Sequence, residues 1–128
     1  MKKLIVLFSI LFFTALGISA ETHFYTTKLM NAKIKGKPET GWTFINTLNL
    51  SIDTDTRRIV IDSPEIQIID FTAFSTRKGS DFKEIKASAT DYHYIPINIY
   101  MTEYNDGNFY LTIEYADVRY TYKLDPVI

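Results

Sequence analysis

Apolar and polar residues alternate with a period of two along most of the chain after residue 20, and helical spacing is hard to find there. Successive side chains of a β-strand point to opposite faces, so this alternation is typical of strands with one apolar face. In segment 44–52, for example, Phe44, Leu48 and Leu50 alternate with polar residues. The chain is therefore expected to be all-β.

Short clusters of turn-forming residues divide the alternating region into about eight strands. One of these strands, 65–76, is apolar on both faces and is expected to be the most central. We predict a single small domain, residues 21–128, in which antiparallel strands form a meander. An up-and-down, calycin-like barrel is favoured over a β-sandwich, because closure removes exposed strand edges. The expected strands cover residues 24–34, 44–52, 57–62, 65–76, 81–89, 95–101, 109–115 and 118–122.

The last forty residues predict two hairpins in a defined register, because residues that pair across antiparallel strands share a face. A three-residue loop at 105–107, with Gly107 in the left-handed conformation, pairs Met101 with Leu111. A tight turn at 116–117 pairs the apolar residues of the following strands. The same turn places Glu114 opposite Arg119 on the other face.

The first twenty residues have the order of a secretory signal peptide. Lys2 and Lys3 precede an apolar run, which ends in the small residues Gly17 to Ala20. We expect cleavage after Ala20, with cleavage after Gly17 as the alternative. The protein is therefore predicted to be exported, to the periplasm or the extracellular space, with no membrane anchor after cleavage.

Composition excludes several classes of function. The chain has 128 residues, of which 46% are hydrophobic and 15% aromatic, and this content argues against intrinsic disorder. It contains no cysteine, so it has no thiolate metal site and no cysteine nucleophile. Its formal net charge of −1 gives no electrostatic footprint for nucleic acid. No nucleic-acid partner is therefore expected.

No pattern of catalytic or metal-ligating residues stands out. The two histidines, His23 and His93, are too few for a zinc site without cysteine, and no serine lies in a strained turn. Asp53 and Asp55 invite a calcium site, but aspartate is also a favoured turn residue. We predict no enzymatic activity, no cofactor and no metal. A hydrolase based on paired carboxylates is kept as an alternative, because the chain has fifteen acidic residues.

Tyrosine has an uneven distribution, since eight of the nine tyrosines lie between Tyr92 and Tyr122. In the predicted register they form two sets. Three face inward with the apolar residues, and with Trp42 they are candidates to line a ligand site in the barrel interior or mouth: Tyr115, Tyr120 and Tyr122. Three fall on the opposite face and are candidates for a surface that binds a glycan or a protein: Tyr100, Tyr104 and Tyr110.

Three short motifs are similar to signatures of the lipocalins and occur in the same order. They are Gly41-Trp42, Thr90-Asp91-Tyr92 and Arg119. The lipocalin pattern has one residue between the glycine and the tryptophan, which are adjacent in this chain. The resemblance implies an eight-stranded barrel, and no ligand-binding residue is carried over from it.

The expected function is binding. The leading hypothesis is a small ligand held in the barrel interior or mouth, although eight strands enclose barely enough room for one. The alternative is a secreted interaction module that binds a glycan or protein through its outer tyrosine face.

Overall fold

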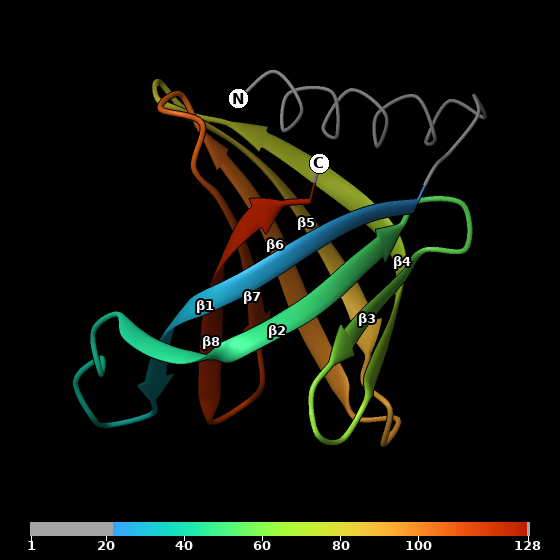
Figure 1. Ribbon diagram of the computed structural model, residues 1–128. Coiled ribbons are helices and arrows are strands. Elements are labelled where there is room, and N and C mark those ends of the chain that lie inside the picture. Colours follow the sequence, from blue (N-terminus) through green and yellow to red (C-terminus); the bar gives the residue numbers. More distant parts are fainter. Residues whose placement is uncertain (1–21, 128) are drawn as a thin grey trace.

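The computed structural model describes residues 22–127, apart from the side chains of residues 73 and 74. The predicted signal peptide, 1–20, lies outside the described residues. The described chain is a single closed barrel in which each strand pairs with its neighbours in sequence and the last pairs with the first (Figure 1). All pairs are antiparallel, so the predicted up-and-down barrel is confirmed. The strands are β1 (Thr22–Ile34), β2 (Thr43–Asp53), β3 (Arg58–Asp62), β4 (Gln67–Lys78), β5 (Phe82–Thr90), β6 (Pro96–Tyr104), β7 (Phe109–Glu114) and β8 (Val118–Pro126).

The barrel interior is filled by the apolar half of each alternating strand. Every strand contributes at least one buried side chain, and aliphatic residues, above all isoleucines, dominate. An eight-stranded barrel is just wide enough for side chains to fill, and the described inward-facing side chains pack against one another there. The largest fully buried side chains are Phe109, Ile52, Ile59, Ile61, Ile69, Ile85, Ile99, Met101 and Leu111.

Both predicted C-terminal hairpins form in the predicted register. Met101 pairs with Leu111 across β6 and β7, and Glu114 pairs with Arg119 across β7 and β8. Gly107 has a φ of 88° and its N–H donates to the Tyr104 carbonyl at 2.9 Å. A left-handed residue at this position disfavours any side chain with a Cβ atom.

Three strands differ from the sequence prediction because the pairing of each is irregular. Phe44 on β2 was expected to share the apolar face of Leu48 and Leu50, but it is 84% exposed. Ile45 packs against the core instead, because the β1–β2 register shifts between Leu48 and Phe44.

In β1 the register shifts between Thr27 and Leu29, so residues on opposite sides of the shift face inward with opposite parity. In β4 it shifts between Phe71 and Phe74. The segment 65–76 is therefore not a central strand buried on both faces, because every strand of a closed barrel has one outer face.

One carboxyl group lies among the inward-facing side chains. Glu103 shares the inward parity of Met101 and pairs with Phe109, and only 5% of its surface is exposed. Its Oε2 atom is buried without a hydrogen-bond partner. Burial raises the pKa of Glu103, and the positive charge of Lys83 partly opposes that increase. The ionised carboxylate is therefore a cost to the folded state.

We predict that Ile99→Ala lowers the free energy of unfolding by about 2–5 kcal/mol, because it leaves a cavity in the filled interior. Denaturant unfolding measures the change. Ile66→Ala removes the same atoms at a position that is 57% exposed and should change stability by only about 0.5 kcal/mol. Equal losses for the two variants would show that the interior is not tightly packed.

Glu103→Gln should raise the thermal stability of the protein at neutral pH, because it removes a buried charge. A carboxyl whose pKa is raised on folding holds its proton more tightly in the folded state, so folding is favoured as pH falls. The advantage of the variant should therefore shrink toward about pH 4, where the carboxyl of the wild type is protonated. Melting curves over this pH range test the prediction, and a variant that is less stable at pH 7 contradicts it.

Candidate functional site

The outer face of β5 to β8 carries rows of polar and aromatic side chains. The strand register sets Glu84, Thr102 and Tyr110 side by side in one row. The next row runs from Tyr100 on β6 through Thr112 on β7 to Thr121 on β8. These side chains point outward because the apolar residues between them fill the barrel.

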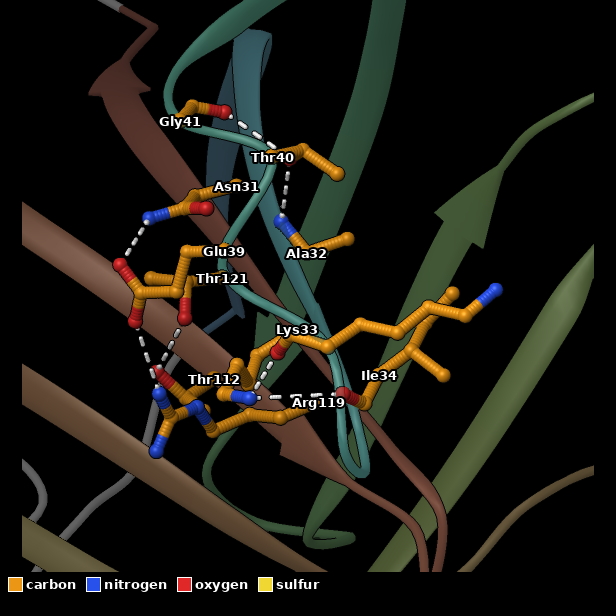
Figure 2. A network of polar contacts seen from close by, with 11 residues as sticks. Asn31, Ala32, Lys33, Ile34, Glu39, Thr40, Gly41, Thr112, Arg119 and Thr121 are labelled. Atoms are coloured by element: carbon orange, nitrogen blue, oxygen red, sulfur yellow. Dashed lines mark hydrogen bonds and ion pairs between the residues drawn. The ribbon is translucent and has the colours of Figure 1, made fainter.

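The loop between β1 and β2 folds back over the outside of β8 and holds one edge of this face. Glu39 accepts hydrogen bonds from Arg119 Nη2 at 3.0 Å and from Asn31 Nδ2 at 3.3 Å. Thr40 and Ala32 exchange two further bonds, at 2.9 and 3.1 Å. Figure 2 shows these contacts tying the loop to β1 and to Arg119 on β8. They bring the end of the loop close to β7.

Trp42 is the last residue of this loop, and its ring lies 5.5 Å from the ring of Tyr110. Tyr110 in turn contacts Tyr104 edge to face, with ring centroids 5.6 Å apart. The three rings line an open groove of about 670 Å³, a size within the usual range of ligand-binding clefts. We call it the outer aromatic groove. Its lining residues are Trp42, Arg77, Glu84, Tyr100, Thr102, Tyr104, Asp106, Tyr110, Thr112, Glu114, Arg119 and Thr121.

Hydrogen bonds within the groove fix several of its polar groups in place. Glu84 accepts one bond from Arg77 and one from Thr102, both at 3.0 Å. The Tyr100 hydroxyl donates to Glu114 Oε1 at 3.1 Å. Burial raises the pKa of Tyr100, and the bond to Glu114 raises it further, so the hydroxyl stays protonated. The groove therefore presents a preorganised set of donors and acceptors.

A second hollow of about 370 Å³ lies at the barrel mouth, beside the β5–β6 and β7–β8 loops. Asp91 organises it: its Oδ1 accepts from the backbone N–H groups of His93 and Ile95, and its Oδ2 accepts from Tyr115, all at 2.9 Å. Burial alone would raise the pKa of Asp91, but these hydrogen bonds outweigh it and the pKa is lowered. Asp91 is thus an ionised structural cap of the mouth.

The structure places the two predicted tyrosine sets in different sites. The inward set, Tyr115, Tyr120 and Tyr122, lines the mouth together, and the outer set, Tyr100, Tyr104 and Tyr110, lines the groove. Trp42 does not join the inward set. The grouping of Trp42 with it is corrected, because the β1–β2 loop carries this residue onto the outer surface beside Tyr110.

Sequence reasoning missed the charged residues of the groove, notably Arg77, Glu84 and Arg119. Two of them were detectable in principle. The predicted hairpin already placed Arg119 opposite Glu114, and a register for β5 against β6 would have placed Glu84 beside Thr102. The contact between Arg119 and Glu39 spans 80 residues and has no local signal.

Asp53, which the sequence suggested as part of a calcium site, stabilises the turn between β2 and β3. Asp53 Oδ1 accepts from the backbone N–H groups of Asp55 and Thr56, at 2.9 and 3.1 Å. Such bonds are typical of aspartate at turns. Among the described residues, no three histidine or acidic side chains gather closely enough to hold a metal ion.

Comparisons with family models, curated proteins and solved structures find no match to this chain. The similarity of three short motifs to lipocalin signatures therefore has no support beyond the barrel itself. In residues 22–127, no helix has the length and apolar character needed to cross a membrane.

We predict that Glu39→Ala frees the β1–β2 loop and moves Trp42 away from Tyr110. Trp42 is the single tryptophan of the chain, so its emission should shift to longer wavelength and its quenching by acrylamide should increase. Thermal stability should change little, because a half-exposed ion pair contributes at most about 1 kcal/mol.

Asp70→Ala is the matched control. It breaks a similarly exposed ion pair, with Arg58 on β3, and should leave the emission of Trp42 unchanged. Unchanged emission in Glu39→Ala as well would show that the loop contacts do not position Trp42.

Proposed function

We propose that this protein is an exported, non-catalytic binding protein that captures a carbohydrate in its outer aromatic groove. The observation that supports this proposal most directly is the combination of neighbouring aromatic rings with fixed hydrogen-bonding groups in one open groove. Export is proposed from the predicted signal peptide.

Sugar chemistry matches this combination. A pyranose ring has a face of C–H bonds, which packs on an aromatic ring, and a rim of hydroxyls, which both donate and accept hydrogen bonds. The rings of Trp42, Tyr104 and Tyr110 offer such faces, with Trp42 47% and Tyr104 39% exposed. The carboxylates and hydroxyls beside them, such as Glu114 and Thr112, offer partners for the sugar hydroxyls.

A peptide partner fits the outer face less well. Extended peptides commonly bind by adding a strand to a free sheet edge. All eight strands of the described barrel pair on both sides, so that mode has no template here. Recognition of a peptide would depend on side chains alone.

The contacts of two groove carboxylates, Glu84 and Glu114, argue against a hydrolase. Both oxygens of Glu84 are already engaged, one by Arg77 and one by Thr102. Glu114 accepts the hydroxyl of Tyr100. A glycosidase needs an acid and a base that are free to exchange protons with the substrate. These contacts favour binding over catalysis.

The test is to replace Tyr100, Tyr104 and Tyr110 together with serine and to measure capture on an array of neutral oligosaccharides. Binding should fall by at least about tenfold, equivalent to 1.4 kcal/mol, while the melting temperature changes little. Tyr94→Ser removes a tyrosine that is 87% exposed and outside the groove, and it should bind like the wild type. If stability and binding are lost in parallel, the three tyrosines are structural.

The barrel mouth supports a second candidate function, the binding of a small ligand. The observation in its favour is the hollow of about 370 Å³, where Tyr120 and Tyr122 lie beside Gln67 and Asp91. Native mass spectrometry of protein purified from its own host tests this candidate. A discrete added mass that is lost in Tyr122→Ala would support a ligand at the mouth, and a mass without addition would leave the outer groove as the proposed site.

A further inference from the structure

Aromatic rings on the outer face form a continuous row that crosses several strands. The row begins with Trp42 after the β1–β2 loop, continues through Tyr110 on β7 and Tyr104 on β6, and ends at Phe82 on β5. Neighbouring ring centroids are 5.5, 5.6 and 6.1 Å apart, and the planes of these pairs of rings meet at 35°, 83° and 52°. Three of the rings line the groove, and Phe82 extends the row past its edge, beneath the guanidinium of Arg77 at 5.1 Å.

The spacing of these rings is close to the length of one sugar unit in an extended chain. A monosaccharide would cover one ring and leave the others exposed to water. A chain of about three or four units would contact successive rings, some by the face and some by the edge. An open groove of about 670 Å³ has room for such a chain.

The charges of the groove indicate a neutral chain. Two arginines and three carboxylates line it, so it has no excess of positive charge. Both arginines also have a carboxylate partner, Arg77 with Glu84 and Arg119 with Glu39, each at 3.0 Å. A uronic-acid or sulfated polymer would have to displace these partners and would meet the remaining carboxylates.

We propose that the ligand of the outer aromatic groove is a linear, neutral glycan of about three or four sugar units, which lies across β5 to β8 along the row from Trp42 to Phe82. This inference rests on the proposed function and adds the length, direction and charge of the ligand. Trp42, Tyr110 and Tyr104 bind the central units, and Phe82 binds a terminal unit that only longer chains reach.

The test is calorimetry with cello-, xylo- and manno-oligosaccharides of one to six units, and with oligogalacturonates as the charged series. In a neutral series that binds, affinity should rise by about tenfold or more between two and four units and then level off. Oligogalacturonates should bind more weakly than that neutral series.

Phe82→Leu provides the positional test, because leucine keeps an apolar side chain at this site but removes the flat ring. The variant should lose affinity several-fold for chains of four or more units and keep the wild-type affinity for two units. Tyr94→Ser is the control that should change neither. A melting curve of Phe82→Leu verifies that the barrel is intact.

Three results would overturn the inference and leave carbohydrate binding in place: equal affinity for two and six units, stronger binding of the oligogalacturonates, or an equal effect of Phe82→Leu at every length. If no oligosaccharide of any series binds, the proposed function itself fails, and the inference fails with it.

Discussion

Inward-facing side chains from all eight strands pack together in the barrel, and the rest of the structure depends on this packing. Apolar burial stabilises the fold by roughly 25 cal/mol per Å² of surface removed from water, and the chain has no disulfide to supplement it. Bulky residues such as Ile52, Ile59 and Ile99 are fully buried. A ligand in the centre of the barrel would have to replace the contacts that hold the barrel closed.

The proposed binding surfaces therefore lie outside the packed core. The barrel mouth keeps a small hollow, but its central carboxylate, Asp91, already caps a loop and holds Tyr115. The outer face of β5 to β8 has more freedom, because its side chains do not support the core. The β1–β2 loop completes that face by adding Trp42 beside Tyr110. An aromatic, hydrogen-bonding groove is the consequence.

The sequence was most informative where neighbouring strands are joined by short turns. The pairing of Met101 with Leu111 and of Glu114 with Arg119 followed from alternation and from the φ required at Gly107. The pairing irregularities in β1, β2 and β4 were not predictable, because local alternation does not show where the register between two strands shifts. The position of Trp42 could not be predicted either, since the loop that carries it is held by a contact between Glu39 and Arg119 on β8.

In the candidate site, too, the residues set by local alternation could be predicted, and those set by long-range pairing could not. The outward direction of Tyr100, Tyr104 and Tyr110 was a consequence of strand parity, and the structure places the three in one groove. Arg77 and Glu84, two of their charged neighbours, come from β4 and β5, whose register the sequence did not define. Local periodicity thus predicts which face a side chain occupies, and long-range pairing decides which side chains meet there.

The most direct test of this account is a ¹H–¹⁵N NMR titration of the protein with the neutral oligosaccharide that binds most tightly. If the outer groove is the binding site, the largest shifts will fall on the Trp42 indole N–H and on the amides of Tyr104, Tyr110 and Thr112, with little change in the buried core of the barrel. Shifts that instead cluster at Asp91, Tyr115 and Tyr120 would place the ligand at the barrel mouth and contradict the account.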